Sequence, residues 1–177
     1  MRRQKRWDTY FRSICKVVAK NSTCFSRQIG AVLTRDNVII STGYNGPPRG
    51  IDQCDTRCIN DHNLIKDLEE RNIDPIDALN MRKCPRQILG FPSGEGLEYC
   101  PAIHAEKNCL LAAARNGVCT KGTTIYLNTS ISPCSQCFGA LINAGVNEVV
   151  LDKATPYDKT VEWLMKHEKL KIREFET

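Results

Sequence analysis

The segment from residue 104 to 151 reads HAEKNCLLAAARNGVCTKGTTIYLNTSISPCSQCFGALINAGVNEVVL, and its pattern decides the fold. Helical and β-rich stretches alternate along it, with Gly117 placed to stop the first helix. We expect helices over 104–116 and 134–144, and strands over 124–128 and 148–151. Strands that alternate with helices indicate parallel pairing, with the helices packed on the sheet.

The flanking sequence extends this pattern in both directions. We expect a helix over 160–167 and a last strand over 170–175, an amphipathic opening helix over 7–20, and a hairpin with strands over 28–33 and 38–44. The sequence therefore predicts the α/β class. Its architecture would be three layers, α/β/α, around a central mixed sheet of about five strands, with the hairpin as an antiparallel edge.

The chain of 177 residues fits one domain, 1–177. Residues 51–103 show no clean core pattern, hold four of the ten cysteines, and include an acidic helical stretch at 64–71. A structureless loop of that length would be unusual. We interpret the segment at about 51–100 as an insertion on the domain.

Composition excludes several classes of protein. Hydrophobic residues make up 41% and charged residues 25% of the chain, as in ordinary globular proteins. No apolar run is long enough to span a bilayer, and the basic start at 2–6 lacks the apolar stretch of a signal peptide. We expect a cytoplasmic protein with no membrane partner. Its net charge of +5 favours an anionic partner, either a small phosphate compound or a nucleic acid.

Ten cysteines in a chain of this kind indicate metal ligation, because the cytosol keeps thiols reduced. Cys15, Cys109 and Cys119 are isolated in helical or apolar contexts, and we expect them to be small buried hydrophobes. The other cysteines are candidates for metal sites.

Two short motifs carry the chemistry. His104-Ala105-Glu106 starts one expected helix, and Pro133-Cys134-Ser135-Gln136-Cys137 starts another. The two cysteines are three residues apart, so if Pro133 begins the helix both thiols project from its first turn, where the helix dipole favours thiolate. His104 would complete three protein ligands to Zn²⁺ and leave the fourth position open, as in catalytic zinc sites. Glu106 could then serve as the catalytic acid and base without ligating.

A closed structural zinc site is the alternative interpretation of the cysteine pair. It would require a fourth protein ligand, and none lies nearby in the sequence. The His-x-Glu and Pro-Cys-x-x-Cys pattern instead matches the signature of zinc-dependent nucleobase deaminases.

The chain resembles the cytidine and deoxycytidylate deaminase superfamily, and within it the dCMP deaminases. The resemblance covers nearly the whole chain apart from roughly 60–90. Besides the two motifs it rests on SRQIGAV at 26–32, STGYNGPP at 41–48 and IHAEKN at 103–108. It implies the cytidine deaminase-like fold and the zinc-dependent hydrolysis of dCMP to dUMP and ammonia, which supplies dUMP for dTMP synthesis.

The resemblance also implies roles for substrate-binding residues. Asn45 would hydrogen-bond the sugar hydroxyl, the Ala105 N–H would hold the cytosine carbonyl, and the Ser132 carbonyl would accept from the exocyclic amine. Arg27 would contact the phosphate, with Tyr157 as a wall of the phosphate pocket. Asn45 could instead be a turn residue, and Arg27 a solvated charge.

Regulation is a further implication of the resemblance. Similar dCMP deaminases are often hexamers that dCTP activates with Mg²⁺ and dTTP inhibits. Arg115 matches a helix residue implicated in that control, and Gly46 lies in the turn shared with regulated relatives. Arg115 could equally be an exposed helix charge.

A second zinc site is predicted from the remaining cysteines. Cys54 and Cys58 have a spacing that structural zinc tolerates. Relatives with a second zinc have cysteines that match Cys24 and Cys54, completed by residues just before the His-x-Glu motif, where this chain has Cys100. The expected set is Cys24, Cys54, Cys58 and Cys100, with Cys84 as the alternate for any one of them. Free buried thiols are the other interpretation.

Two rival functions remain open. A polynucleotide deaminase acting on tRNA adenosine or DNA cytosine would use the same zinc and glutamate, but it needs a basic, aromatic channel. Aromatic residues make up only 7% of the chain, and acidic residues follow Asn45. A zinc-stabilised binding module without catalytic activity is the second rival. The presence of Glu106 argues against it, because binding alone does not require a carboxylate beside an open zinc site. Cytidine, guanine, a pyrimidine of riboflavin synthesis, 5-modified dCMP and dCTP are alternative small substrates.

Overall fold

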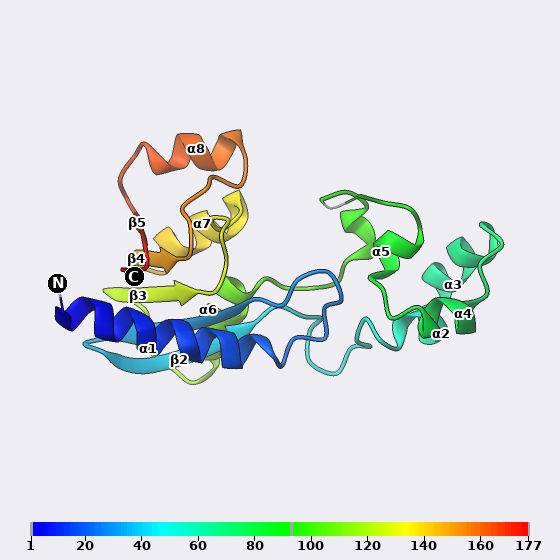
Figure 1. Ribbon diagram of the computed structural model, residues 1–177, viewed down its shortest axis with the longest axis horizontal. Helices are drawn as coiled ribbons and strands as arrows, with labels where there is room; N and C mark the ends of the chain where they lie inside the picture. The colour runs from blue at the N-terminus through cyan, green and yellow to red at the C-terminus, as the bar shows by residue number, and fades with distance from the viewer. Residues whose placement is uncertain (1, 93, 177) are drawn as a thin grey trace. The chain divides into compact units, whose positions relative to one another are not determined.

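A computed structural model describes residues 2–92 and 94–176 (Figure 1). The chain divides into two compact units. We call the first the sheet unit; it comprises Met1–Ser22, Ile29–Asn45 and His104–Thr177. We call the second the helical unit; it comprises Thr23–Gln28 and Gly46–Ile103, and it contains the expected insertion.

The sheet unit is built on one five-stranded mixed sheet with the strand order β2-β1-β3-β4-β5. The strands are β1 (Gly30–Arg35), β2 (Val38–Tyr44), β3 (Thr123–Leu127), β4 (Val146–Leu151) and β5 (Lys171–Glu174). β1 pairs antiparallel with both β2 and β3, whereas β3, β4 and β5 are parallel. The expected mixed sheet of the α/β class is confirmed, with the hairpin at its antiparallel edge.

Turn chemistry explains the hairpin. Asp36 and Asn37 adopt positive φ angles of 52° and 63°. A two-residue turn with both central residues in this region matches the twist of the flanking strands, and Asn and Asp tolerate it better than most residues.

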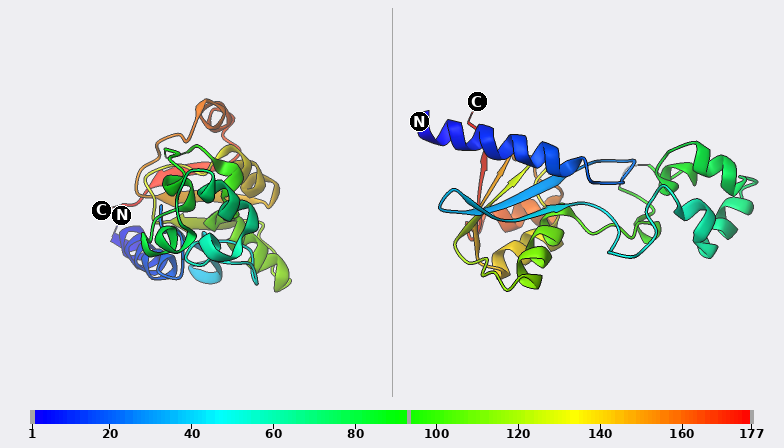
Figure 2. Two further views of the ribbon diagram at one scale, coloured as in Figure 1. Left: turned by 90° about the vertical axis from the view of Figure 1, so that its right-hand side faces the viewer. Right: turned by 90° about the horizontal axis from the view of Figure 1, so that it is seen from below.

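Helices cover both faces of the sheet (Figure 2). One face packs against α1 (Arg2–Ala19) through a core that includes Phe11, Val32 and Val150. The opposite face packs against α6 (Ala105–Arg115), α7 (Ser135–Asn143) and α8 (Lys159–Met165). The three-layer prediction is therefore confirmed. Within the residues that the structure describes, no helix combines the length and apolar character of a membrane span.

Glycine at position 43 permits the close approach of α6 to β2. A Cβ built on Gly43 would lie 2.3 Å from the Cys109 nitrogen and 2.6 Å from the Ala105 oxygen, both backbone atoms. Only a residue without a side chain fits there. The close approach fixes the first half of α6, which carries Glu106, against the strand that leads to Asn45.

The helical unit has its own small core, which the sequence pattern did not reveal. It contains α2 (Arg57–Asn60), α3 (His62–Glu69), α4 (Pro75–Asn80), α5 (Pro85–Ile88) and the 3₁₀ helix η1 (Leu97–Tyr99). Leu64, Leu68 and Leu89 are buried together. Asp61 and Asp74 cap α3 and α4 by accepting backbone N–H bonds, which explains where these helices begin.

Candidate metal and catalytic site

Three predicted ligands converge in the sheet unit. The ligand atoms of His104, Cys134 and Cys137 lie within 4.8 Å of one another. The His104 Nδ1 atom is 3.5 Å from the Cys134 Sγ atom and 3.4 Å from the Cys137 Sγ atom. Two helix starts far apart in the sequence thus place one imidazole and two thiols at a single point.

These distances fit zinc. Zn–S and Zn–N bonds of about 2.3 and 2.0–2.1 Å in a tetrahedron place sulfur and nitrogen about 3.6 Å apart. The observed separations of 3.5 and 3.4 Å are close to this value. One His and two Cys are also a donor set that zinc favours in sites with three protein ligands.

The ligands lie at different helical positions from those expected. Helix α7 begins at Ser135, so Cys134 is its N-cap and Pro133 lies outside the helix. The condition that Pro133 begins the helix is therefore not met, and α7 starts one residue after the expected start at residue 134. His104 is likewise the N-cap of α6. Neither N-cap side chain makes a capping hydrogen bond, so both point their donor atoms to the metal site instead.

The electrostatics of two of the three ligands, Cys134 and His104, favour charged forms, whereas the hydrogen bond with Cys134 and burial raise the pKa of the Cys137 thiol. The pKa of Cys134 is lowered to about 4, chiefly by the hydrogen bond from Cys137 and, against the cost of burial, by His104. The pKa of His104 is raised, first by its hydrogen bond with Cys134. A thiolate is therefore readily available at this point, as metal binding requires.

Glu106 lies in the first turn of α6, two residues after His104, and is buried. Burial raises the pKa of its carboxyl above the ordinary value, and the charge of His104 opposes the rise. A buried carboxyl with a raised pKa, next to a metal site, is a candidate for general acid and base catalysis.

Asn45 directly follows β2 and is also buried. Its Oδ1 atom accepts a hydrogen bond of 2.8 Å from the Ile29 N–H, and its own N–H donates to the Ile29 oxygen over 3.1 Å. The residue is thus held firmly in the sheet unit. Its predicted contact with a sugar hydroxyl remains a prediction.

Ser132, Tyr157 and Ala105 complete the predicted substrate residues of this unit. Ser132 is buried, and its hydroxyl accepts a hydrogen bond of 3.0 Å from the Tyr157 N–H. This bond anchors the start of the loop that carries the half-exposed Tyr157 ring. Ala105 is the first residue of α6, so its N–H has no partner within the helix and is available to an acceptor.

Arg27 and Gly46 belong to the helical unit. Arg27 is exposed, and its assignment to a phosphate remains a prediction. Gly46 exchanges backbone hydrogen bonds with Ile103, at 3.1 and 2.9 Å. This pairing closes the two ends of the long segment in the helical unit.

The five cysteines considered for a second zinc all lie in the helical unit. Cys54, Cys58 and Cys84 are buried, and Cys24 and Cys100 are partly buried. Burial raises the pKa of Cys54 to about 12, and Cys24, Cys84 and Cys100 add to the rise. In the parts of the chain that the structure describes, the group of His104 is the only one whose ligand atoms all lie within 4.8 Å.

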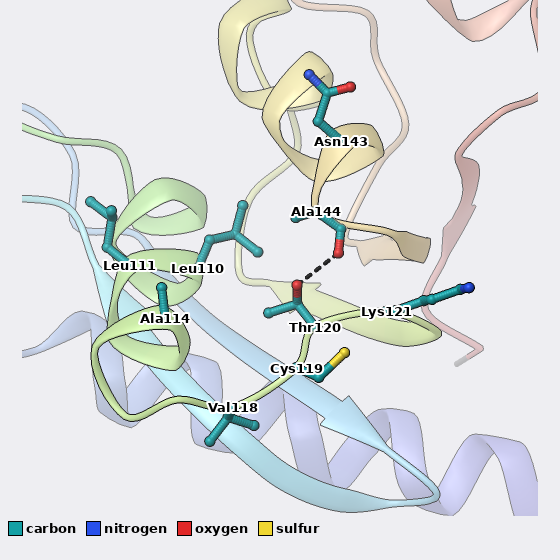
Figure 3. A pocket seen from close by; sticks show the side chains of 9 residues that line it. All are labelled: Leu110, Leu111, Ala114, Val118, Cys119, Thr120, Lys121, Asn143 and Ala144. Atoms are coloured by element: carbon teal, nitrogen blue, oxygen red, sulfur yellow. Dashed lines mark hydrogen bonds between the residues drawn. The ribbon is translucent and has the colours of Figure 1, made fainter.

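Arg115 is exposed in the last turn of α6, at the opposite end from Glu106. A pocket of about 420 Å³ lies beside this end of the helix (Figure 3). Its lining residues are Leu110, Leu111, Ala114, Val118, Cys119, Thr120, Lys121, Asn143 and Ala144. Neither Arg115 nor a metal ligand is among them.

The expectation of a buried Cys119 was wrong, because its thiol is exposed, whereas Cys15 and Cys109 are buried as expected.

A three-layer α/β/α unit that brings a His and two Cys to the starts of two helices, with a glutamate two residues after the His, defines the zinc deaminase class. The family assignment is more specific. A family model described as the cytidine and deoxycytidylate deaminase zinc-binding region matches residues 5–153. The chain belongs to this family.

Relatives with this family's activity in their names match most of the chain. It is 31% identical over 169 residues to a deoxycytidylate deaminase of Schizosaccharomyces pombe, covering 96% of this chain and 44% of the relative. It is 30% identical over 152 residues to the deoxycytidylate deaminase of Mycobacterium phage D29, covering 83% of this chain and 94% of the relative. The chain thus spans less than half the length of the yeast relative but nearly all of the phage relative.

A solved structure shares the fold. The dCMP deaminase of cyanophage S-TIM5, in complex with dCMP and dUMP, superposes with a TM-score of 0.61 at 19% identity, covering 94% of both chains. This similarity shows the cytidine deaminase-like fold.

Proposed function

We propose that this protein is a zinc-dependent dCMP deaminase, which hydrolyses dCMP to dUMP and ammonia and supplies dUMP for dTMP synthesis. The observation that carries the proposal is that a buried carboxyl, Glu106, lies beside a group of three possible metal ligands. These ligands are His104, Cys134 and Cys137. Relatives of the same length class that are named deoxycytidylate deaminases support the choice of substrate.

His104, Cys134 and Cys137 would hold the zinc ion. When bound, zinc supplies Lewis-acid activation of the attacking water at a fourth, open position. Closed tetrahedral coordination would need a fourth donor from the protein. The three donors grouped in the described residues fit the open arrangement.

Glu106 moves the protons. Its carboxylate would accept a proton from the water as the water oxygen bonds to C4 of cytosine, and would deliver this proton to the ring nitrogen. It would then take the remaining proton of the new C4 hydroxyl, which becomes the carbonyl, and deliver it to the departing amine. The bond between C4 and the amine breaks, and ammonia leaves. Burial raises the pKa of Glu106, so the group holds a proton more readily between these transfers.

The substrate contacts are the second part of the proposal. Asn45 would bind the sugar hydroxyl, the Ala105 N–H the cytosine carbonyl, and the Ser132 carbonyl the amine. The fixed position of Asn45 and the unpaired helix-start position of Ala105 support these roles. Arg27 and Tyr157 would face the phosphate.

One substrate panel tests the function. Ammonia release is measured from dCMP, dCTP, cytidine and guanine, with wild-type protein and with Glu106→Gln at equal zinc content. We expect turnover of dCMP above all the others, and loss of it in the variant. Preference for a polynucleotide substrate, with salt-dependent retention on single strands, would instead favour the tRNA or DNA deaminase. No ammonia from any substrate would favour the binding module.

We also propose a second, structural zinc ion in the helical unit. The cysteines that raise the pKa of Cys54 most are Cys24, Cys84 and Cys100. This supports Cys84 in place of Cys58 as the fourth ligand. Elemental analysis should give two zinc ions per chain, falling to one in Cys84→Ser and staying at two in the control Cys58→Ser. One zinc ion in fully active wild-type protein would rule the site out.

Regulation is the last part of the proposal. The enzyme would be a hexamer, activated by dCTP with Mg²⁺ and inhibited by dTTP, with Arg115 and Gly46 in the control region. The rigid α6 helix links Arg115 to Glu106. The rate against dCMP should be sigmoidal alone, hyperbolic with dCTP and depressed with dTTP, and Arg115→Glu should flatten these responses. Hyperbolic kinetics indifferent to both triphosphates would exclude the control.

A further inference from the structure

Ser22 lies just beyond the end of α1 and is almost fully buried, with 3% of its surface exposed. Its hydroxyl donates a hydrogen bond of 2.7 Å to the backbone oxygen of Asn45. A buried side-chain bond between positions 23 residues apart is unlike the local bonds of serines within helices. It ties the end of α1 to the residue that follows β2.

The Asn45 side chain is held in a defined orientation. Because its Oδ1 atom accepts from the Ile29 N–H over 2.8 Å, the amide oxygen must face Ile29, the residue just before β1. The amide nitrogen then lies at the other end of the side chain, away from the Ile29 N–H. The Ser22 bond fixes the backbone of the same residue.

Asn108 holds the adjacent peptide from the opposite side. It lies on α6, where its N–H donates to the His104 oxygen over 3.0 Å. Its side-chain Nδ2 atom donates to the Tyr44 oxygen over 2.7 Å. Two consecutive carbonyls, those of Tyr44 and Asn45, are therefore bound by side chains from two separate segments, α6 and the residues just beyond α1.

We infer that Ser22 and Asn108 are positioning residues, which hold Asn45 in register with Glu106. Asn108 shares its helix with Glu106, and Ser22, just beyond α1, binds the backbone oxygen of the residue that follows β2. The sugar contact and the catalytic carboxylate are thereby set at a fixed spacing. Such spacing matters, since a misplacement of about 1 Å can cost roughly 100-fold in rate. The inference rests on the proposed function of Asn45 as the ligand of the sugar hydroxyl.

The test is a comparison of Ser22→Ala, just beyond α1, with Ser13→Ala within α1. The Ser13 hydroxyl is exposed and donates only to the Thr9 oxygen of its own helix, so its loss should leave the kinetics unchanged. We expect Ser22→Ala to raise KM for dCMP about 5- to 10-fold, the effect of one buried hydrogen bond, with a smaller change in kcat and unchanged zinc content.

A truncated substrate separates positioning from general loosening. In 2′,3′-dideoxycytidine monophosphate the 3′-hydroxyl is absent, so the KM penalty of Ser22→Ala should largely disappear. An equal penalty on both substrates, or none on dCMP, would overturn the inference. If wild-type protein does not deaminate dCMP, the proposed function fails instead.

A second variant covers the case in which Ser22→Ala does not fold. Asn108→Asp keeps the shape of the side chain but replaces the donor to Tyr44 with an acceptor. We expect it to lower kcat/KM for dCMP at least 10-fold, with a smaller loss for the dideoxy substrate. Asn116→Asp, at the exposed C-cap of α6, makes the same change of charge and should stay near wild type. Equal behaviour of the two aspartate variants would contradict the role of Asn108.

Discussion

Asp8 on α1 and Arg173 on β5 form a bidentate salt bridge. The Arg173 Nη1 and Nη2 atoms donate to the Asp8 Oδ2 and Oδ1 atoms over 2.6 and 2.9 Å. The Asp8 side chain has no exposed surface. It also accepts hydrogen bonds from the Gln4 side chain and the Glu176 N–H. The first helix and the last strand of the sheet unit are thus joined by a fully bonded buried carboxylate.

Replacing Asp8 with Asn should destabilise the fold strongly. Removing one partner of a buried ion pair costs about 3–5 kcal/mol in comparable pairs, and the ion pair of 3.1 Å that Arg173 keeps with Glu148 should place the loss at the lower end of this range. Urea unfolding should show this loss. The control is Glu162→Gln, which breaks the exposed pair of Glu162 with Lys166 and should cost under about 1 kcal/mol. Equal midpoints for the two variants would contradict the structural role of Asp8.

The same carboxylate predicts a pH dependence of stability. Burial alone would raise the pKa of Asp8, but the hydrogen bonds from Arg173, Glu176 and Gln4 outweigh it, so the pKa lies below 3.8. A group with a lowered folded-state pKa stabilises the fold above its unfolded value and loses that contribution as the pH falls through the folded value. Between about pH 4 and 2, unfolding free energy should fall more steeply in wild type than in Asp8→Asn. Parallel curves would show that Asp8 is not the titrating group.

Glu106→Gln should keep the zinc and lose deamination. The amide preserves the shape of the side chain but cannot carry a proton, and general acid–base catalysis contributes about 100- to 10,000-fold. Ammonia release and zinc content are measured on the same sample. Wild-type turnover at full zinc occupancy would refute the assigned role of Glu106.

His104→Ala should cost both metal and activity, because it removes one of three grouped ligands. Zinc per chain is measured after dialysis against a weak chelator. His167→Ala is the matched control. The His167 ring packs edge-on against the Trp163 ring, with 4.5 Å between the ring centroids, in the C-terminal part of the sheet unit. The variant protein should keep its zinc. Unchanged zinc in His104→Ala would show that the ligand assignment is wrong.

Gly43→Ala and Gly139→Ala should change stability in opposite directions. At position 43 the new methyl group would meet the Cys109 nitrogen at 2.3 Å, and the backbone of α6 must move. At position 139, within α7, it would meet nothing within 4 Å. Alanine in an open helix position stabilises by about 0.5–1 kcal/mol relative to glycine. Thermal unfolding should therefore show a lower Tm for the first and a higher Tm for the second.

The sheet unit could be predicted from sequence because its elements are long and periodic. Gly117 stops α6 with a φ of 66°, and the hairpin turn follows from Asp36 and Asn37. The convergence of His104 with the two cysteines also follows from motifs. The exact helix starts cannot be predicted in this way. A proline such as Pro133 can be the first residue of a helix or, as here, can precede the N-cap.

The helical unit could be predicted only in part. Its α2, α4 and α5 helices have only four to six residues, too few for a periodic pattern. Asp74 before Pro75 was a usable signal, because an Asp cap followed by Pro marks a helix start. Spacing along the chain also cannot decide between Cys58 and Cys84 as neighbours of Cys54, because that depends on how the short helices pack.

The unconventional N-caps of α6 and α7 have a consequence for how the protein matures. His104 and Cys134 occupy positions where Ser, Thr, Asp or Asn would usually stabilise the first turn by about 1 kcal/mol. If these side chains hold the proposed zinc ion, the order of both helix starts becomes thermodynamically linked to zinc occupancy. Chains made under zinc scarcity would expose the first turns of α6 and α7 to amide exchange and proteases while the remaining sheet unit stays folded. The supply of zinc during synthesis would then set how much of the protein survives quality control.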